Sequence, residues 1–486
     1  MDEEIRTDVV IIGSGATGLA AALTIAESGA RVMVFEKQRS LGGTSNFFHG
    51  TFAVESKMQR ARYITYSRDE AFKNIMEYSH WRANPRLVRA IVNESASTID
   101  WLQDQGVVFL DATINMPDMP RTYHVVNGDG AAIIKALAVK AKEKGATIRP
   151  GVPVKRVIKH GDRISGVIIE DGEEEVQVRA ESVVIGSGGY ANNKDWIKKY
   201  TGYEMGVNIF PVGNTDKMGD GIRMAWEAGA AEEGMGVVHI LRIGPIHPAI
   251  ESMSFLELPA LQPDLWVSPK GQRFCNEGLA FYDTSLGNVN ARYKEGYTFS
   301  IFDDSILQRL RENGMIRSVH PQYPPGTWPP GFDQIFQHAL NNAKGEVFSA
   351  DSIGKLALQI GVEPQVLKNT VDEYNSFCQK GYDALFAKKP EYLWPLTGKK
   401  FYAMKAHTAY LGTLGGIKVN HKMEVIDKQD NPIPGLYAGG IDIGGMWGDS
   451  YCMDVSAGLS SAVALNSGRI AGQNVLAYIS RTKSHG

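Results

Sequence analysis

Three features of the sequence predict an α/β fold built in two parts. Residues 7–12 form a short apolar segment typical of a buried strand, and a glycine-rich turn and a helical segment follow it. A strand, a glycine turn and a small-residue helical segment recur at residues 431–472, close to the other end of the chain. Prolines and aromatic residues are frequent in the stretch between them. The sequence therefore predicts a discontinuous domain, residues 1–239 and 412–486, with an α+β domain inserted at residues 240–411.

The first strand begins a βαβ unit. The turn after it reads GSGATG, which places Gly13, Gly15 and Gly18 at the spacing of a dinucleotide-binding loop. Gly13 permits the tight turn, Gly15 lets the backbone approach a pyrophosphate, and Gly18 lets the helix pack on the strand. The N–H groups at the start of the helix can bind phosphates. Glu36, at the end of the second strand, can accept hydrogen bonds from ribose hydroxyls, so the whole pattern indicates a Rossmann-like domain.

Two further segments favour FAD over NAD as the dinucleotide. Residues 42–45 (GGTS), just after Glu36, offer a second small-residue turn that can reach the same phosphates and the flavin. Residues 431–445 and 456–472 return to the site from the other end as strand, turn and helix. A flavin with its long ribityl chain commonly needs both ends of the chain, whereas NAD domains usually complete their site within one contiguous stretch.

The residues expected to bind FAD lie in these segments and in the strands between them. They are Gly13, Gly15, Ala16, Thr17, Gly18, Glu36, Lys37, Gly43, Thr44, Ser45, Val154, Gly188, Gly189, Asp220, Gly440, Asp442 and Leu459. Between the two ends, residues 147–181 alternate as strands do, which predicts a small β-meander. Helical patterns in the inserted domain fall at residues 351–361 and 363–378.

Composition limits the classes of function. The formal net charge of −3 gives no support for a nucleic-acid partner. The three cysteines, Cys275, Cys378 and Cys452, form no CxxC or CxxCH pattern, so a zinc knuckle, a haem attachment site or a disulfide framework is not expected. The N-terminus enters a strand without a signal-peptide pattern, and no run approaches the roughly 18–20 apolar residues that span a bilayer. We expect a soluble, cytoplasmic protein with no metal site and no membrane span.

A series of segments in this order resembles one family, the flavoproteins that include soluble fumarate reductase and 3-ketosteroid dehydrogenases. The segments are GSGATG with Glu36, LGGTS, RTYHVVNGDG, IGSGGYANN, GDGIRMAWEAGA, WVSPKGQRFCNE, LGTLGGI and PGLYAGG. The resemblance implies a two-part FAD domain and a mobile capping domain, with the active site at their seam. It also implies hydride exchange between flavin N5 and a carbon beside an activated C–C bond, while a second group moves the proton.

The residues of the fumarate branch are largely missing. There, the segment after the Asn-Glu pair carries an arginine that delivers the proton, but here it reads GLAFY and includes Phe281. Glu257 falls where the proton relay has a glutamate, yet Ala260 stands where its partner arginine is expected. Gly412 occupies the position of a histidine that would clamp a dicarboxylate. The resemblance therefore disfavours fumarate reduction.

The ketosteroid dehydrogenase branch is the better match. It lines its site with tyrosines, and Tyr123, Tyr282 and Tyr451 fall in the matching regions as expected catalytic residues. Removal of hydride from Cβ requires loss of a proton from Cα, which a ketone acidifies by stabilising the enolate. Two assignments stay open: Phe281 takes the place of Tyr282 if no residue is inserted, and Asp454 falls where Tyr451 is expected.

The remaining assignments concern substrate and flavin attachment. Residues expected to contact the substrate are Phe281, Gly412, Trp447 and His247. His124 and His239 are expected to be structural. His49 follows the Gly-Gly segment, but its surroundings do not resemble a covalent flavin-histidine motif, so FAD is expected to be non-covalent. Asp442 is the expected substitute for the family's acidic or amide group, because Ile441 holds that position.

The sequence thus predicts an FAD enzyme that interconverts a saturated ketone and its α,β-unsaturated form, acting on a steroid or a smaller cyclic ketone. Electrons come from or go to a separate partner, since the chain has no haem or iron–sulfur motif. Three alternatives remain: a reductase of an unsaturated carboxylate, an electron-transfer subunit of a larger complex, and a flavin-binding protein that has lost catalysis.

Overall fold

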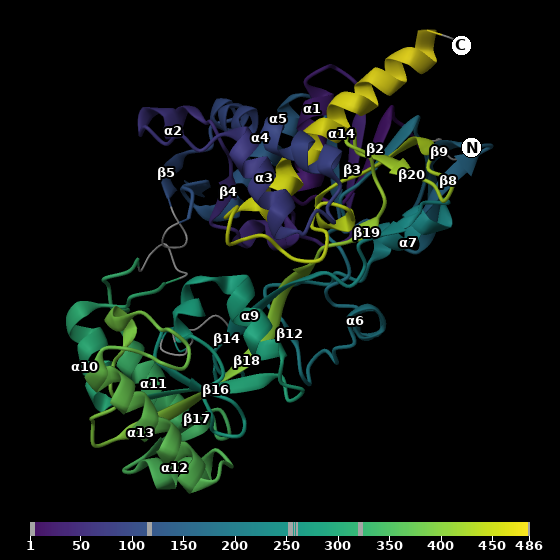
Figure 1. The fold of residues 1–486 in the computed structure, drawn as a ribbon. Coiled ribbons are helices and arrows are strands. Elements are labelled where there is room, and N and C mark those ends of the chain that lie inside the picture. The colour runs from purple at the N-terminus through teal and green to yellow at the C-terminus, as the bar shows by residue number, and fades with distance from the viewer. Residues whose placement is uncertain are drawn as a thin grey trace. The chain divides into compact units, whose positions relative to one another are not determined.

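The computed structural model describes residues 5–113, 119–250, 256, 258, 261–318 and 324–484 (Figure 1). The chain forms two compact units. Unit 1 comprises Met1–Gly202, Pro211–His239 and Leu411–Gly486, and unit 2 comprises Tyr203–Phe210 and Ile240–Tyr410. Glu257 and Ala260, which enter the argument against fumarate reduction, lie outside the described residues.

A six-stranded sheet forms the centre of unit 1. Its strands, in spatial order, are β20 (Glu424–Ile426), β21 (Pro432–Ala438), β11 (Ser182–Ile185), β2 (Val9–Ile12), β3 (Val32–Glu36) and β7 (Thr147–Pro150). All neighbours pair in parallel except β20 and β21, which are antiparallel. Strand β2 lies in the interior and is buried along its whole length, as its uninterrupted VVII sequence predicts. The predicted α/β class is therefore confirmed.

Three smaller sheets complete the strands of unit 1. They are β1 (Ile5–Arg6), β10 (Glu174–Arg179), β9 (Arg163–Asp171) and β8 (Val154–His160); β4 (Gly50–Phe52), β6 (Tyr123–Val126) and β5 (Phe109–Thr113); and β13 (Glu232–Glu233) with β19 (Gly416–Ile417). The predicted meander is present as β8, β9 and β10, but its first residues form β7, which pairs in parallel with β3.

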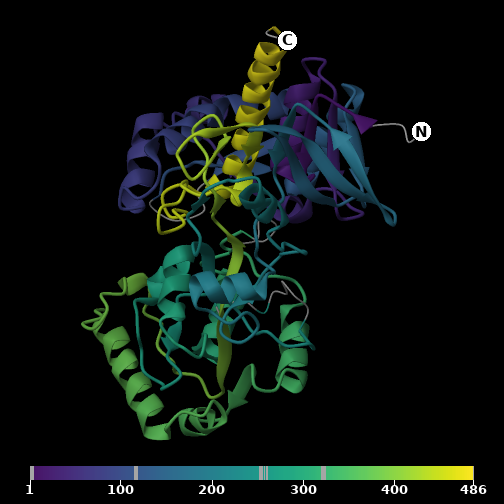
Figure 2. The same cartoon turned by 90° about the vertical axis from the view of Figure 1, so that its right-hand side faces the viewer.

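The helices of unit 1 join and flank these strands. They are α1 (Ala16–Ala26), α2 (Lys57–Ala61), α3 (Arg68–Tyr78), α4 (Pro85–Asp104), α5 (Asp129–Glu143), α6 (Lys194–Thr201), α7 (Asp220–Glu227), α14 (Leu459–Ser484) and the 3₁₀ helices η1 (Gly43–Phe47) and η4 (Gly440–Asp442). Helix α14 packs along α1, as Figure 2 shows with the yellow C-terminal helix beside the purple N-terminal elements. The small residues of both helices permit this approach: a Cβ on Gly468 would lie 2.3 Å from the carbonyl oxygen of Thr17.

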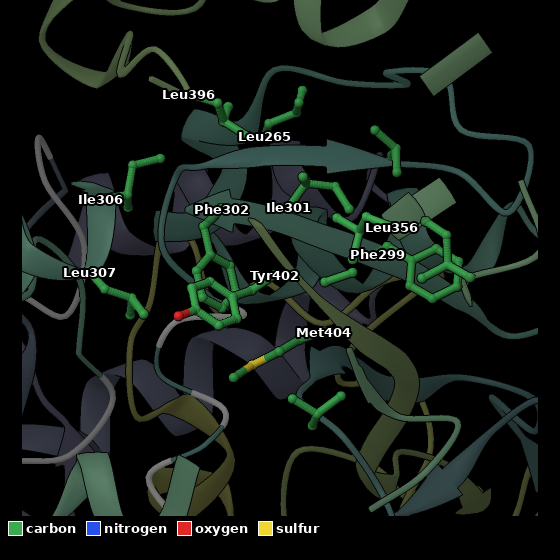
Figure 3. Close-up of a cluster of buried hydrophobic side chains, with 14 of the residues drawn as sticks. Leu265, Phe299, Ile301, Phe302, Ile306, Leu307, Leu356, Leu396, Tyr402 and Met404 are labelled. Carbon is green, nitrogen blue, oxygen red and sulfur yellow. The ribbon is translucent and has the colours of Figure 1, made fainter. Parts of the chain in front are cut away.

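Unit 2 is built on a second sheet, whose strands in spatial order are β12 (Phe210–Pro211), β18 (Phe401–Thr413), β16 (Tyr297–Asp303) and β15 (Leu265–Val267). Two further strands, β14 (Val238–Ile243) and β17 (Val347–Ala350), also pair with β18. Its helices are α9 (Asp283–Ala291), α10 (Asp304–Asn313), α11 (Phe332–Asn342), α12 (Ile353–Gln359), α13 (Pro364–Lys380), η2 (Glu277–Phe281) and η3 (Pro390–Tyr392). Aromatic and aliphatic side chains of the sheet and helices form its core, in which the rings of Phe302 and Tyr402 stack with centroids 5.5 Å apart (Figure 3).

Candidate cofactor and substrate site

The turn between β2 and α1 is as tight as its glycines predict. Gly13 has φ 98°, and a Cβ there would lie 2.4 Å from the carbonyl oxygen of Gly186. A Cβ on Gly18 would lie 1.9 Å from the carbonyl oxygen of Gly13. Because only glycine fits at either position, the loop keeps its backbone close to the start of α1, where free N–H groups can bind a phosphate.

Glu36 is buried at the end of β3 and is oriented by the same turn. Its Oε2 accepts hydrogen bonds from the backbone N (2.9 Å) and the Oγ (2.7 Å) of Ser14, and its Oε1 accepts one from the backbone N of Gln38 (2.8 Å). A carboxylate offers about four acceptor positions, so Glu36 retains capacity for a ribose hydroxyl. Ser14, which sequence reasoning missed, holds this acid in place.

The GGTS segment, as η1, meets the first turn of α1. The Oγ of Ser45 accepts a hydrogen bond from the backbone N of Ala16 at 3.1 Å. The backbone N of Val152 donates to the carbonyl of Glu36 at 2.9 Å, which brings Val154, at the start of β8, near the end of β3. Four residues expected to bind FAD thus lie around the βαβ unit: Ala16, Glu36, Ser45 and Val154.

The C-terminal segments reach the same helix. The backbone N of Gly440 donates to the Oγ of Ser467 at 2.8 Å, and a Cβ on Gly440 would lie 2.5 Å from the Oγ1 of Thr17. Helix α14 packs against both η4 and α1. The expected return of the C-terminal segments to the first βαβ unit is therefore present in the structure.

Asp442 is oriented by protein donors. Its carboxylate accepts hydrogen bonds from the Oγ of Ser187 (3.0 Å) and the backbone N of Gly188 (2.9 Å) and Gly189 (2.8 Å). Burial raises the pKa of Asp442, although these hydrogen bonds favour the charged form. The geometry indicates that Asp442 holds the glycine turn after β11.

Lys37 and Asp220, both expected to contact FAD, pair with each other. The Nζ of Lys37 lies 2.8 Å from Asp220 and 3.1 Å from the carboxylate of Asp216, and it also donates to the backbone carbonyl of Asp216. Burial alone lowers the pKa of Lys37, but the two acids outweigh it and raise the pKa. The charge of Lys37 is therefore satisfied within the protein.

Lys217 is a buried cation in this region that sequence reasoning missed. A Cβ on Gly188 would lie 3.3 Å from its Cε. Within the described residues its ammonium makes no hydrogen bond or ion pair, although only 7% of the residue is exposed. Burial lowers the pKa of Lys217 to about 8, and the charge of Asp442 opposes that shift. A buried cation that makes no hydrogen bond or ion pair is costly even with Asp442 nearby, so Lys217 favours an anionic ligand.

Two expected catalytic tyrosines lie beside the N-terminus of α14, which begins at Leu459. Tyr451 is buried, and its hydroxyl oxygen accepts a hydrogen bond from the backbone N of Ser460 at 3.3 Å. The ring of Tyr123 lies against Gly458, where a Cβ would come within 2.7 Å of its Cδ2. Because a helix N-terminus stabilises nearby negative charge, a phenolate or an enolate oxygen is favoured here.

Trp447 and Asp454 flank Tyr451 in sequence and differ in their surroundings. The ring of Trp447 packs on Tyr451 with centroids 5.0 Å apart. Asp454, the alternative to Tyr451, accepts a hydrogen bond from the hydroxyl of Tyr78 at 3.2 Å. Tyr451 therefore lies against the aromatic side chain expected to contact the substrate.

Phe281 and Tyr282 lie at the end of η2, in unit 2. The ring of Phe281 is buried and packs on Tyr392 with centroids 5.2 Å apart, whereas Tyr282 is half-buried. The segment in which the resemblance calls for a proton-delivering arginine thus contributes a buried hydrocarbon ring and a half-buried phenol, and its sequence contains no arginine.

A buried ion cluster of Arg273, Glu277, Asp383 and Lys388 anchors η2, and sequence reasoning missed it. Two nitrogens of Arg273 donate to Glu277 at 2.8 and 2.9 Å, and two donate to Asp383 at 2.8 and 3.2 Å. Lys388 Nζ lies 3.4 Å from Glu277. All four side chains are at most 1% exposed.

The last two expected substrate residues have local partners. In unit 2, the Nδ1 of His247 accepts a hydrogen bond from the backbone N of Ala249 at 3.1 Å. In unit 1, a Cβ on Gly412 would lie 3.3 Å from the Cδ1 of Ile441, so this position faces an aliphatic side chain. The position of Gly412 presents no cation.

The residues of unit 1 fit FAD. The glycine turn suits the pyrophosphate, Glu36 suits the ribose, and Lys217 supplies a buried positive charge that makes no ion pair with a described acid. Among the residues that the structure describes, no group of three or more His, Cys, Asp or Glu could hold a metal ion. No helix in the described part of the chain is long and apolar enough to cross a membrane.

Comparison with known proteins is consistent with this site. A family model described as an FAD binding domain matches residues 8–450. The vinyl phenol reductase of Lactiplantibacillus plantarum is 32% identical over 480 residues, covering 97% of this chain and 96% of that protein. The digoxin reductase of Eggerthella lenta is 28% identical over 517 residues, covering 98% of this chain and 88% of that protein. A crystal structure of 3-ketosteroid Δ1-dehydrogenase from Sterolibacterium denitrificans shares the fold, with a TM-score of 0.80 at 20% identity, covering 97% of this chain and 99% of that one.

Proposed function

Because the chain belongs to the FAD-binding flavoprotein family of fumarate reductases and 3-ketosteroid dehydrogenases, it is an FAD-dependent oxidoreductase of CH–CH bonds that reduces C=C bonds, and we propose that its substrate is a neutral alkene conjugated to a ketone or a phenol. The observation that carries this proposal is the absence of an arginine from the GLAFY segment after the Asn-Glu pair, in which the ring of Phe281 is buried. A dicarboxylate would need cations, and the aliphatic contact between Gly412 and Ile441 offers none.

The tyrosines supply the proton chemistry in this proposal. Reduced FAD supplies a hydride when it is bound. A proton must also reach the other alkene carbon, and the hydroxyl of Tyr451, at the N-terminus of α14, is the proposed donor. The helix N-terminus stabilises the phenolate left behind. Tyr123, beside the same helix, is proposed to orient the substrate oxygen, and a catalytic role for Tyr282, in unit 2, stays a prediction from the sequence.

The curated relatives support a neutral, ring-containing substrate. One is named for vinyl phenol and another for digoxin, and both are reductases. In an enone, donors at the ketone oxygen stabilise the enolate that hydride addition forms. In a vinyl phenol, Tyr451 protonates the terminal carbon and its phenolate recovers a proton from the phenol hydroxyl, which leaves a benzylic carbon that accepts hydride. Both substrates therefore need hydrogen-bonding groups at a neutral oxygen.

The proposal includes non-covalent FAD. The proposed cofactor contacts are the residues expected from the sequence, except that Lys37, Asp220 and Asp442, which the protein itself pairs, are proposed to position the site. Lys217 is added as the partner of an anionic group of FAD. The imidazole of His49 is engaged by the carboxylate of Asp129, 2.8 Å from its Nδ1. Electrons reach FAD from a separate donor. Acid precipitation should release all the flavin into the supernatant, and flavin retained in the pellet would contradict this part of the proposal.

Stopped-flow reoxidation of photoreduced holoenzyme tests the substrate class. Anaerobic enzyme is mixed with 4-vinylphenol, cyclohexenone, a 3-ketosteroid enone and fumarate, and the flavin absorbance is followed. We expect rapid reoxidation by at least one neutral alkene and none by fumarate. In Y451F, we expect a reoxidation rate about 10²–10⁴-fold lower with the FAD content unchanged, because a positioned acid contributes about that factor. Reoxidation by fumarate alone would refute the proposal.

A further inference from the structure

Three buried rings of unit 1 form a cluster that the proposed chemistry uses only in part. The imidazole of His239 lies on the ring of Tyr451 with centroids 3.9 Å apart and planes tilted by 39°. The indole of Trp447 lies on the same tyrosine at 5.0 Å, with planes tilted by 53°. We call His239, Tyr451 and Trp447 the ring cluster.

Two polar atoms of the ring cluster have no protein partner. Among the described residues, neither the Nε2 of His239 nor the Nε1 of Trp447 makes a hydrogen bond, although these residues are only 7% and 1% exposed. Buried polar atoms in native proteins are nearly always hydrogen-bonded, and each exception needs an explanation. Two exceptions on neighbouring rings point to one missing ligand.

The chemistry of the ring cluster selects the kind of ligand. Burial lowers the pKa of His239 to about 3, so its imidazole is neutral at physiological pH. Indole N–H is only a donor, while neutral imidazole can donate or accept depending on its tautomer. The ring cluster therefore offers hydrogen bonds and aromatic surface without positive charge. A carboxylate would lose its hydration here without gaining a cation, whereas a neutral oxygen would be satisfied.

We propose that the ring cluster is the recognition site for the neutral oxygen-bearing end of the conjugated substrate, with the Nε2 of His239 and the Nε1–H of Trp447 as its hydrogen-bonding groups. This inference rests on the proposed function, because it takes a neutral conjugated alkene as the ligand. A phenol hydroxyl can donate to His239, and a ketone oxygen can accept from it. In both cases Trp447 donates.

Matched ligand pairs on the oxidised holoenzyme test this assignment. The dissociation constants of 4-ethylphenol and ethylbenzene, and of cyclohexanone and cyclohexane, are measured by equilibrium dialysis. The ratio within each pair is the preference for the oxygen. We expect wild type to prefer the oxygen-bearing member of at least one pair by about 10- to 100-fold, since a buried group left unpaired costs that much. The phenol and ketone pairs then distinguish the two sources of the oxygen.

Variants separate recognition from structure. H239L and W447F should each reduce the oxygen preference about 10-fold, with the affinity for the oxygen-free ligand nearly unchanged. H239Q, which keeps a polar group, should retain part of the oxygen preference. H160Q, which replaces an exposed histidine, should match wild type. If H239L fails to retain FAD, then H239Q and W447F decide, because W447F keeps the aromatic surface.

Some outcomes would contradict the ring-cluster site alone, and one would contradict the proposed function as well. An unchanged oxygen preference in H239L and W447F would overturn the ring-cluster site. A changed FAD dissociation constant or flavin spectrum, with the preference unchanged, would also overturn it, because the two groups would then contact the cofactor. If wild type reacts with neutral alkenes but H239L and W447F keep the oxygen preference, the ring-cluster site is wrong and the proposed function stands. If wild-type flavin responds to carboxylates alone, the proposed function fails as well.

Discussion

The buried ion cluster of unit 2 and the ring cluster of unit 1 are both withdrawn from water, but their polar atoms are satisfied in opposite ways. In the ion cluster, Arg273 donates to two carboxylates through four hydrogen bonds, and Lys388 lies against one of them. In the ring cluster, His239 and Trp447 each keep a buried nitrogen without a described partner.

This difference separates structural groups from ligand-binding groups. Charges taken out of water are tolerated when each has a partner, so a closed network serves to fix the chain. A buried polar group that is left open costs free energy in the free protein and regains it when a ligand arrives. By this criterion, the ion cluster holds η2 in place, whereas the ring cluster and Lys217 bind ligands.

Breaking the ion cluster should have the largest effect on stability. In R273M, Glu277 and Asp383 lose their main cation while they stay buried. We expect the free energy of unfolding to fall by about 3–5 kcal/mol, as for other broken buried pairs. Urea unfolding followed by tryptophan fluorescence measures this. The matched control is R311Q, which removes the exposed ion pair with Asp333 and should cost about 1 kcal/mol or less. Equal effects of the two variants would refute the comparison.

Asp264, also in unit 2, is an exception to this criterion, because its carboxylate is buried without a hydrogen bond and a retained proton, not a ligand, removes its charge. Burial raises the pKa of Asp264 from 3.8 to about 7. The folded state therefore keeps a proton that the unfolded state loses, and stability falls as the pH rises from about 4 through 7. D264N removes this dependence. The free energy of unfolding of D264N minus that of wild type should be roughly 1–3 kcal/mol larger at pH 8 than at pH 4.

Unfolding titrations of D264N and wild type at both pH values provide the measurement. The difference in free energy of unfolding between the two proteins is compared at pH 4 and pH 8, because any pH-independent effect of the amide cancels in that comparison. A difference that stays constant between pH 4 and pH 8 would contradict the raised pKa of Asp264 and its unpaired state.

Lys217 extends the comparison to the cofactor. If its ammonium pairs with an anionic group of FAD, K217M should weaken FAD binding by about 10- to 100-fold, because it removes a charge-assisted hydrogen bond. Wild-type affinity should also fall above pH 8, where the free lysine loses its charge, and K217M should show no such fall. Fluorescence titration of apoprotein with FAD measures both. K155M, which removes the surface ion pair with Glu170, is the control.

The fold was accessible from the sequence because its signals are local. The apolar strand before Gly13, the glycine spacing and the acid at Glu36 define a βαβ unit within a few turns of chain. The meander was misread at its start, where residues 147–150 pair with β3. A short strand carries no mark of which sheet it joins.

The open polar groups could not be found in this way. Lys217 reads as one more lysine in a polar turn, and His239 reads as an ordinary residue of an apolar strand. Their significance depends on the absence of partners, which is a property of the folded chain. The ion cluster shows the same limit, since Arg273 meets Asp383 across more than a hundred residues.

The smallest predicted effect comes from removing a group that the protein already pairs. The hydroxyl of Ser14 orients Glu36, but the backbone N of Ser14 and that of Gln38 also bind this carboxylate. S14A should therefore weaken FAD binding by only about 3- to 10-fold, consistent with one neutral hydrogen bond among several. The same FAD titration measures it beside K217M. If S14A weakened binding more than K217M, pairing within the protein would not distinguish positioning groups from ligand-binding groups, and the unpartnered nitrogens of the ring cluster would not mark a ligand site.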